Sequence, residues 1–175
     1  MNLQLTEDQE FFRATTRRFL ASEAPITEVR RLLDSERGFA PDWWRAAAEL
    51  GWTSMLASEA AGGGSLSGRP LTDAVIVAEE MGRLMSPGPF LPANVVAAAI
   101  SSAGSAEQRE RVLAPLVSGD AVAAWAHGEP GSHWDGAAMR TTADLDGGDV
   151  VINGRKAYAE AAKAADHLLV TARTG

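Results

Sequence analysis

Histidines and carboxylates that could carry out chemistry gather just after position 123. His127 lies six positions before His133, and Glu129 and Asp135 lie beside them. This spacing fits no standard pattern of metal ligands, and a hydrated polar loop accounts for the same residues. We therefore predict no metal site.

Two other arrangements suggest catalysis or phosphate binding only at first sight. Ser132, His133 and Asp135 could be combined into a hydrolase triad, but neighbouring positions point to different sides and no nucleophile elbow is present. Gly62–Gly64 follows neither the dinucleotide-binding pattern nor the P-loop pattern with its lysine. A plain connecting loop is the simpler interpretation of these glycines.

The segment Ala123–Asp135 is the most informative part of the sequence. It places Trp125 on a strand of small residues that ends before the acidic turn Glu129-Pro130. Exposed backbone groups at a strand end, next to aromatic side chains, can hold the edge of a planar heteroaromatic ring. The alternative is a solvated loop with one buried tryptophan.

Composition excludes several classes of protein. The chain has 175 residues, 46% of them hydrophobic, a formal net charge of -7 and no cysteine. Disulfide scaffolds, thiolate metal sites and cysteine nucleophiles are therefore excluded, and the acidic balance disfavours nucleic acid as a partner. The first eight residues lack the features of a signal peptide, and no apolar run is long enough to span a membrane, so we predict a cytoplasmic protein.

Helical spacing dominates the first two thirds of the chain. Capping boxes pair Thr6 with Gln9 and Ser105 with Gln108. The aromatic pairs Phe11-Phe12 and Trp43-Trp44 are predicted to be core. The predicted helices cover residues 6–24, 29–35, 41–50, 70–85, 94–102 and 105–117.

The predicted helix over 70–85 is amphipathic. Apolar residues keep a helical period at Leu71, Val75, Ala78, Met81 and Met85, whereas charged residues lie on other sides at Asp73, Glu79, Glu80 and Arg83. The pattern predicts an apolar face that packs and a charged face that meets water.

Short, turn-punctuated segments replace helical spacing at Gly119-Asp120. We predict an α+β fold: an all-α helical domain over 1–117, then the beginning of an antiparallel β domain over 118–175, which looks incomplete. A hairpin turn is predicted at Asp146–Asp149. Candidate strands are 122–126, 138–143, 150–152, 155–159 and 167–171.

Two motifs in this region resemble those of the acyl-CoA dehydrogenases, flavoenzymes that form a 2,3 double bond in an acyl-CoA thioester. Glu129–Asp135 resembles the family's T-E-P-x-x-G-S-D turn, and Asn153–Tyr158 resembles its N-G-x-K-x-W-I-T stretch. Weaker matches lie in family order along the rest of the chain, at 5–9, 58–64, 79–82, 105–119 and 165–166.

The resemblance implies FAD as cofactor, an acyl-CoA substrate, an electron-transfer partner, a homo- or hetero-oligomer and a role in lipid β-oxidation. By resemblance, Trp125 stands beside the flavin, His127 and Gly128 occupy the strand end on its pyrimidine side, and Tyr158 and Glu160 meet the isoalloxazine ring. The family's catalytic carboxylate belongs to a C-terminal domain, so no catalytic residue is assigned here.

Several of these positions depart from the family pattern. Gly128 lacks a threonine hydroxyl, and His133 and Trp134 replace Gly-Ser at a substrate-binding position near the pantetheine arm. Glu160 puts a carboxylate where a neutral hydroxyl is usual, and its charge would oppose the negative charge of a reduced flavin.

Two functions follow from the resemblance. The chain is part of a flavin-dependent acyl-CoA dehydrogenase, with bulky or steroid-derived acyl-CoAs among its candidate substrates. Alternatively, it belongs to a non-catalytic or flavin-poor subunit that serves a catalytic partner in a hetero-oligomer.

Overall fold

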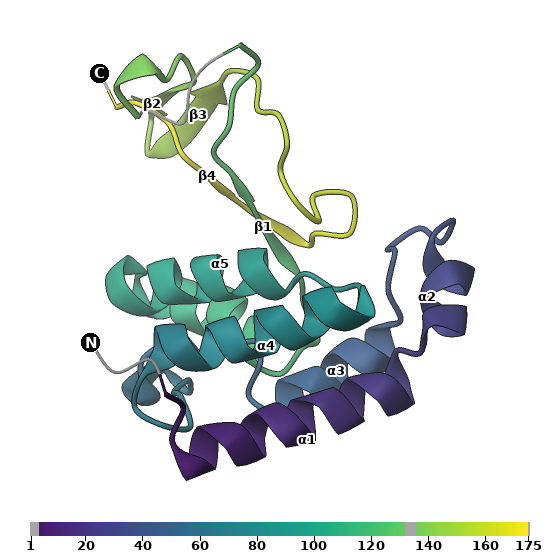
Figure 1. The fold of residues 1–175 in the computed structure, drawn as a ribbon. Helices are drawn as coiled ribbons and strands as arrows, with labels where there is room; N and C mark the ends of the chain where they lie inside the picture. Colours follow the sequence, from purple (N-terminus) through teal and green to yellow (C-terminus); the bar gives the residue numbers. More distant parts are fainter. Residues whose placement is uncertain (1–3, 132–135, 175) are drawn as a thin grey trace.

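The computed structural model describes residues 4–131 and 136–174, which form a helical layer and a smaller β region (Figure 1). The helices fill the lower part of the view, and β1 and β4 lie between them and the β2–β3 hairpin. The helices are α1 (Glu7–Glu23), α2 (Ile26–Leu32), α3 (Pro41–Glu49), α4 (Pro70–Leu84), α5 (Phe90–Ala103), α6 (Ala106–Gln108) and α7 (Ala114–Val117), with a π-helical turn at Arg109–Leu113 and 3-10 turns at Glu59–Ala61 and Gly136–Ala138.

Local signals fix most helix ends. Both capping boxes form: Thr6 Oγ1 accepts from the Gln9 backbone N–H at 3.2 Å, and Ser105 Oγ accepts from the Gln108 N–H at 3.1 Å. Proline opens α3 and α4, where the missing N–H costs no hydrogen bond. Two helices differ clearly from the prediction: α2 begins directly after a proline and ends three residues before the predicted end, and α5 begins four residues earlier than expected, with a proline in its first turn.

Aromatic side chains from the helical layer form the core. Trp44 and Trp52 are fully buried, the rings of Trp43 and Trp44 stack with centroids 5.8 Å apart, and Trp52 meets Phe90 of α5 edge-on. The core prediction for Trp43-Trp44 is confirmed. For Phe11 it is wrong: this side chain is 69% exposed, because α1 packs on its neighbours through other positions.

The buried face of α4 differs from the one that the sequence indicates, although Met81 is buried and Glu79 and Arg83 are exposed as predicted. Leu71, Val75 and Met85 are 70%, 62% and 69% exposed, whereas Asp73 and Glu80 are 0% and 1% exposed. A buried carboxylate is tolerated when it is paired or hydrogen-bonded.

Both buried carboxylates have such partners on α1 or on the loop before α4. Asp73 accepts hydrogen bonds from the side chains of Gln9 and Ser67 at 3.2 and 2.7 Å and from the Ser67 backbone N–H at 2.9 Å. Glu80 accepts two hydrogen bonds from the Arg17 guanidinium, at 2.7 and 2.8 Å. The predicted face is therefore wrong at Asp73 and Glu80, because α4 meets α1 partly through polar contacts, while Ile76, Val77 and Met81 supply its apolar burial.

The β region contains an antiparallel hairpin, as the predicted α+β fold requires, and a second pair that is parallel. The strands β2 (Thr142–Asp146) and β3 (Asp149–Asn153) pair antiparallel around Gly147-Gly148, which confirms the hairpin turn. The strands β1 (Ala123–Ala126) and β4 (His167–Val170) run parallel, with Ala123 opposite His167. Parallel strands need a long crossover, and the hairpin lies within it.

Two predicted strands are wrong. Residues 138–143 begin in a 3-10 turn and join β2 only from Thr142. Residues 155–159 contain no strand; they run beside the end of β1, and Tyr158 has a positive φ of 58° that no regular strand allows. The division into domains 1–117 and 118–175 stays a prediction, while α7 ends at Val117 and β1 begins at Ala123.

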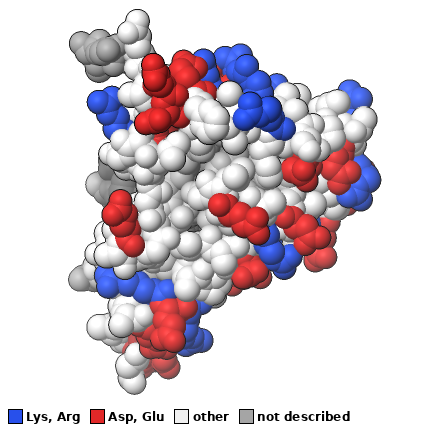
Figure 2. All heavy atoms as spheres, turned by 90° about the horizontal axis from the view of Figure 1, so that it is seen from below, with Lys and Arg blue, Asp and Glu red and all other residues white. Residues whose placement is uncertain are grey.

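Charged side chains interleave on the face that contains α1. Figure 2 shows acidic and basic groups side by side around uncharged surface. Exposed ion pairs between neighbouring residues of one helix, such as Arg13–Glu10 and Arg45–Asp42, also occur in the helical layer. Within the described ranges, no helix is both long and apolar enough to cross a membrane.

Candidate functional site

A cavity of about 190 Å³ lies where the helical layer meets β1. Its walls come from three separate parts of the chain: α5, β1 and the turn that precedes β4. The lining residues are Leu91, Pro92, Val95, Trp125, Tyr158 and Glu160. Three of the five cofactor-binding residues predicted from the sequence thus share one cavity.

Trp125 lines this cavity, and a hydrogen bond fixes its indole ring. Its indole Nε1–H donates to Thr171 Oγ1 at 3.0 Å, and the same hydroxyl lies 3.2 Å from His127 Nδ1. The Trp125 and His127 rings lie 4.7 Å apart at 39°. Trp125 lies on β1 and His127 directly follows its last residue, so the two-residue spacing of extended chain puts both rings on the same side.

Gly128 brings the strand end against the turn. Its carbonyl accepts from the Ala157 N–H at 2.8 Å, and a Cβ at Gly128 would lie 3.0 Å from the Ala157 carbonyl oxygen. Glycine therefore allows a close approach of two backbone segments here. The predicted residues Gly128 and Tyr158 are linked through this contact.

The turn that carries Tyr158 and Glu160 is strained. Tyr158 and Ala161 have φ values of 58° and 60°, a left-handed conformation that costs energy for residues with a side chain. Tyr158 is 89% exposed, and Glu160 is also exposed. The cavity therefore has an apolar wall from α5 and an aromatic and acidic rim from this turn.

Glu129 and Lys156 form an ion pair beside the site, with a distance of 2.9 Å between Oε1 and Nζ. Hydrogen bonds from the Thr141 hydroxyl and backbone N–H, together with Lys156, hold the pKa of Glu129 well below its usual range. The sequence singled out both residues only as parts of motifs, and their pairing was not predicted.

Leu91 and Val95 are site residues that the sequence reasoning missed. They lie one helical turn apart on α5, a helix so uniformly apolar that its pattern indicates burial alone. Leu91 is instead 60% exposed at the cavity. The predicted substrate-binding residues His133 and Trp134 lie outside the described residues.

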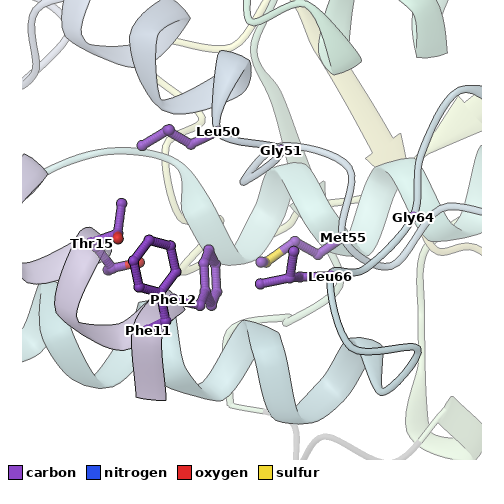
Figure 3. A pocket seen from close by; sticks show the side chains of 9 residues that line it. Phe11, Phe12, Thr15, Leu50, Gly51, Met55, Gly64 and Leu66 are labelled. Atoms are coloured by element: carbon purple, nitrogen blue, oxygen red, sulfur yellow. The ribbon is translucent and has the colours of Figure 1, made fainter. Parts of the chain in front are cut away.

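A second, larger cavity lies on the other side of the helical layer. It measures about 300 Å³ and contains none of the predicted site residues. Figure 3 shows the rings of Phe11 and Phe12 on α1 facing Met55 and Leu66. Along the described chain, no group of three or more histidine, aspartate or glutamate side chains could hold a metal ion.

The glycine loop borders this second cavity through Gly64 and acts as a connection. A Cβ at Gly63 would lie 2.6 Å from the Ser54 carbonyl oxygen and 2.6 Å from the Ala57 Cβ. Close packing therefore requires glycine at Gly63, in agreement with a plain loop.

The helical layer followed by a small β region is a fold shared with solved structures. One is the ChsE4–ChsE5 complex from Mycobacterium tuberculosis, with a TM-score of 0.81, 31% identity, and coverage of 99% of this chain and 44% of that one. Another is the Tcur3481–Tcur3483 steroid ACAD, with a TM-score of 0.79, 28% identity, and coverage of 100% and 45%.

The chain belongs to the acyl-CoA dehydrogenase family. The family's model for the acyl-CoA dehydrogenase N-terminal domain matches residues 6–120. A mitochondrial isobutyryl-CoA dehydrogenase from Dictyostelium discoideum is 34% identical over 173 residues, which are 98% of this chain and 40% of that protein. The chain thus spans less than half the length of the curated relatives that it matches.

Proposed function

We propose that the protein containing this chain is an FAD-dependent acyl-CoA dehydrogenase, and that the chain supplies one wall of its flavin and acyl-CoA site. One observation carries the proposal: a single cavity joins Leu91 and Val95 of α5 to Trp125, Tyr158 and Glu160. Trp125, Tyr158 and Glu160 are positions at which family resemblance places flavin contacts. Family resemblance places the catalytic carboxylate in a C-terminal domain, so we assign no catalytic base to this chain.

The residues of the cavity fit the edge of a flavin ring. Trp125 and Tyr158 offer aromatic surface, and the missing Cβ of Gly128 leaves backbone groups at the strand end close to the turn. When bound, FAD would accept the hydride equivalent that leaves the substrate. The described residues would orient the ring and exclude water from one side.

The α5 wall supports an apolar acyl group as the substrate part that enters here. Leu91, Pro92 and Val95 present hydrocarbon, so this wall favours aliphatic or ring-fused acyl chains over charged ones. A structural neighbour described as a steroid ACAD makes bulky acyl-CoAs reasonable candidates. His133 and Trp134 remain proposed contacts of the pantetheine arm.

A non-catalytic or flavin-poor subunit of a hetero-oligomer is the second candidate. Glu160 favours it, because a carboxylate at the flavin-facing rim opposes the charge that a ring gains on reduction. A neighbouring structure is a complex of two named proteins, ChsE4 and ChsE5. For either candidate function, we also propose an electron-transfer partner, an oligomeric assembly, a place in lipid β-oxidation and a cytoplasmic location.

Anaerobic titration of the full-length protein with acyl-CoA thioesters distinguishes the two functions. A dehydrogenase is yellow as purified, and substrate bleaches its flavin band. A protein without flavin that restores activity only with a second subunit supports the alternative. Glu160→Thr should raise the flavin reduction potential, whereas Glu110→Thr, which removes an exposed carboxylate outside the cavity, should not change it.

A further inference from the structure

Glu129 and Lys156 are charged, largely buried, and not used by the proposed reaction. Their side chains are 5% and 11% exposed, and Nζ lies 2.9 Å from Oε1. A buried ion pair is a poor source of stability, because desolvation offsets much of its attraction. Its position relative to the cavity is more informative.

The Glu129 carboxylate is anchored to the chain just before β2. It accepts hydrogen bonds from the backbone N–H groups of Arg140 and Thr141, at 2.8 and 2.9 Å, and from the Thr141 hydroxyl at 2.6 Å. Several donors keep the group ionised and fix its orientation. Glu129 thus offers Lys156 a rigid negative charge.

Lys156 connects this anchor to the flavin-facing strand end. Its ammonium also donates to the His127 carbonyl oxygen at 3.0 Å. One residue further on, the Ala157 N–H donates to the Gly128 carbonyl oxygen at 2.8 Å. The next residue is Tyr158, where the strained turn begins.

We propose that Glu129 and Lys156 are positioning residues that hold the strand end His127–Gly128 and the turn Tyr158–Glu160 in the single arrangement that binds flavin. This inference rests on the proposed function. A strained turn persists only where its surroundings fix it, and the Lys156 contacts lie directly before it. Without Glu129, Lys156 loses its counter-charge and is drawn toward water, and the turn moves with it.

The ion pair between Arg17 and Glu80 offers a matched control. Glu80 is 1% exposed and accepts two hydrogen bonds from Arg17, but the pair joins α1 to α4 and neither residue lines the cavity. Glu80→Gln therefore tests the loss of a buried carboxylate without touching the proposed clamp, which is the ion pair between Glu129 and Lys156. Lys156→Met is a second variant at the clamp, and it leaves Glu129 with its Thr141 donors.

The experiment compares FAD affinity and thermal midpoint for full-length wild type, Glu129→Gln, Lys156→Met and Glu80→Gln. We expect the two clamp variants to weaken FAD binding by about tenfold or more, the effect that loss of an orienting partner has at metal sites. Glu80→Gln should lower the thermal midpoint and keep wild-type FAD affinity. Clamp variants that bind FAD as well as the Glu80 variant does would overturn the proposal.

Hydrogen exchange of the same proteins tests the clamp without a bound cofactor. The amide of Ala157, protected by its bond to Gly128, should exchange faster in Glu129→Gln and Lys156→Met and not in Glu80→Gln. Unchanged exchange in both clamp variants refutes the positioning role. A wild type that binds no FAD contradicts the proposed function. The exchange experiment needs no FAD, so it still tests the positioning role of Glu129 and Lys156.

Discussion

Thr16→Val should make the protein more stable, although it removes a polar group from a helix. Thr16 is 1% exposed on α1, and its Oγ1 has no hydrogen-bond partner among the described residues. Burial of an unsatisfied hydroxyl costs free energy, and valine has nearly the same shape without that group. The expected gain is about 1 kcal/mol, which corresponds to a rise in thermal midpoint of about 2–4 °C for a region of this size.

Thr53→Val is the matched control. Thr53 is 0% exposed, and its hydroxyl donates to the Val117 carbonyl oxygen at 2.7 Å. The same substitution there removes the donor of the half-buried Val117 carbonyl, so we expect a loss of about 1 kcal/mol. Thermal and urea unfolding of wild type and both variants, measured side by side, show whether each substitution raises or lowers the free energy of unfolding.

A loss of stability in Thr16→Val similar to that in Thr53→Val would refute this reasoning. Thr16 lines the apolar cavity in Figure 3, so such a result would mean that its hydroxyl is satisfied from the cavity, for example by an ordered water molecule.

Three further predictions concern the carboxylates and the flavin-facing segments. The pKa values of Glu129 and Glu80 are lowered in the fold, so both carboxylates stabilise the protein above their unfolded pKa of about 4.5, and this stabilisation is lost as pH falls below that value. Glu129→Gln should therefore reduce the fall in the free energy of unfolding between neutral pH and pH about 3, measured by urea unfolding. Trp125→Ala should weaken FAD binding by about fivefold or more, since an aromatic contact contributes on the order of 1 kcal/mol, and unchanged flavin content would place the ring elsewhere. Gly128→Ala should lower stability by about 1 kcal/mol, because its Cβ would press on the Ala157 carbonyl at 3.0 Å, and an unchanged unfolding midpoint would show that the turn yields freely.

Local signals made the helical layer predictable. The capping residues Thr6 and Ser105 and the prolines at 41 and 70 act within a few residues of their own position, so each end follows from the sequence beside it. The hairpin turn at Gly147-Gly148 is equally local.

The buried face of α4 could not be predicted in this way. Asp73 and Glu80 are buried because Gln9, Ser67 and Arg17, distant in sequence, supply their donors. The parallel pairing of β1 with β4 is also non-local, since the segment between them contains a complete hairpin. Periodicity measures the amphipathicity of one element and says nothing of its partner.

The candidate site was predictable only in part. Family resemblance assigned Trp125, Tyr158 and Glu160 to the flavin site, and the structure brings them to one cavity. The spacing of these residues alone did not predict that they share a site. Leu91 and Val95 were not predicted as site residues, because a cavity wall and a packed core have the same apolar composition. The clamp between Glu129 and Lys156 depends on a turn that sequence reasoning took for a strand.

The most direct test of this account is an experimental structure of the full-length protein after incubation with FAD. We predict an isoalloxazine ring with one edge at Trp125–Gly128 and a second contact at Tyr158–Glu160, on the side of α5 that carries Leu91 and Val95. A flavin bound away from these segments, or saturating FAD that leaves this cavity empty, would contradict it.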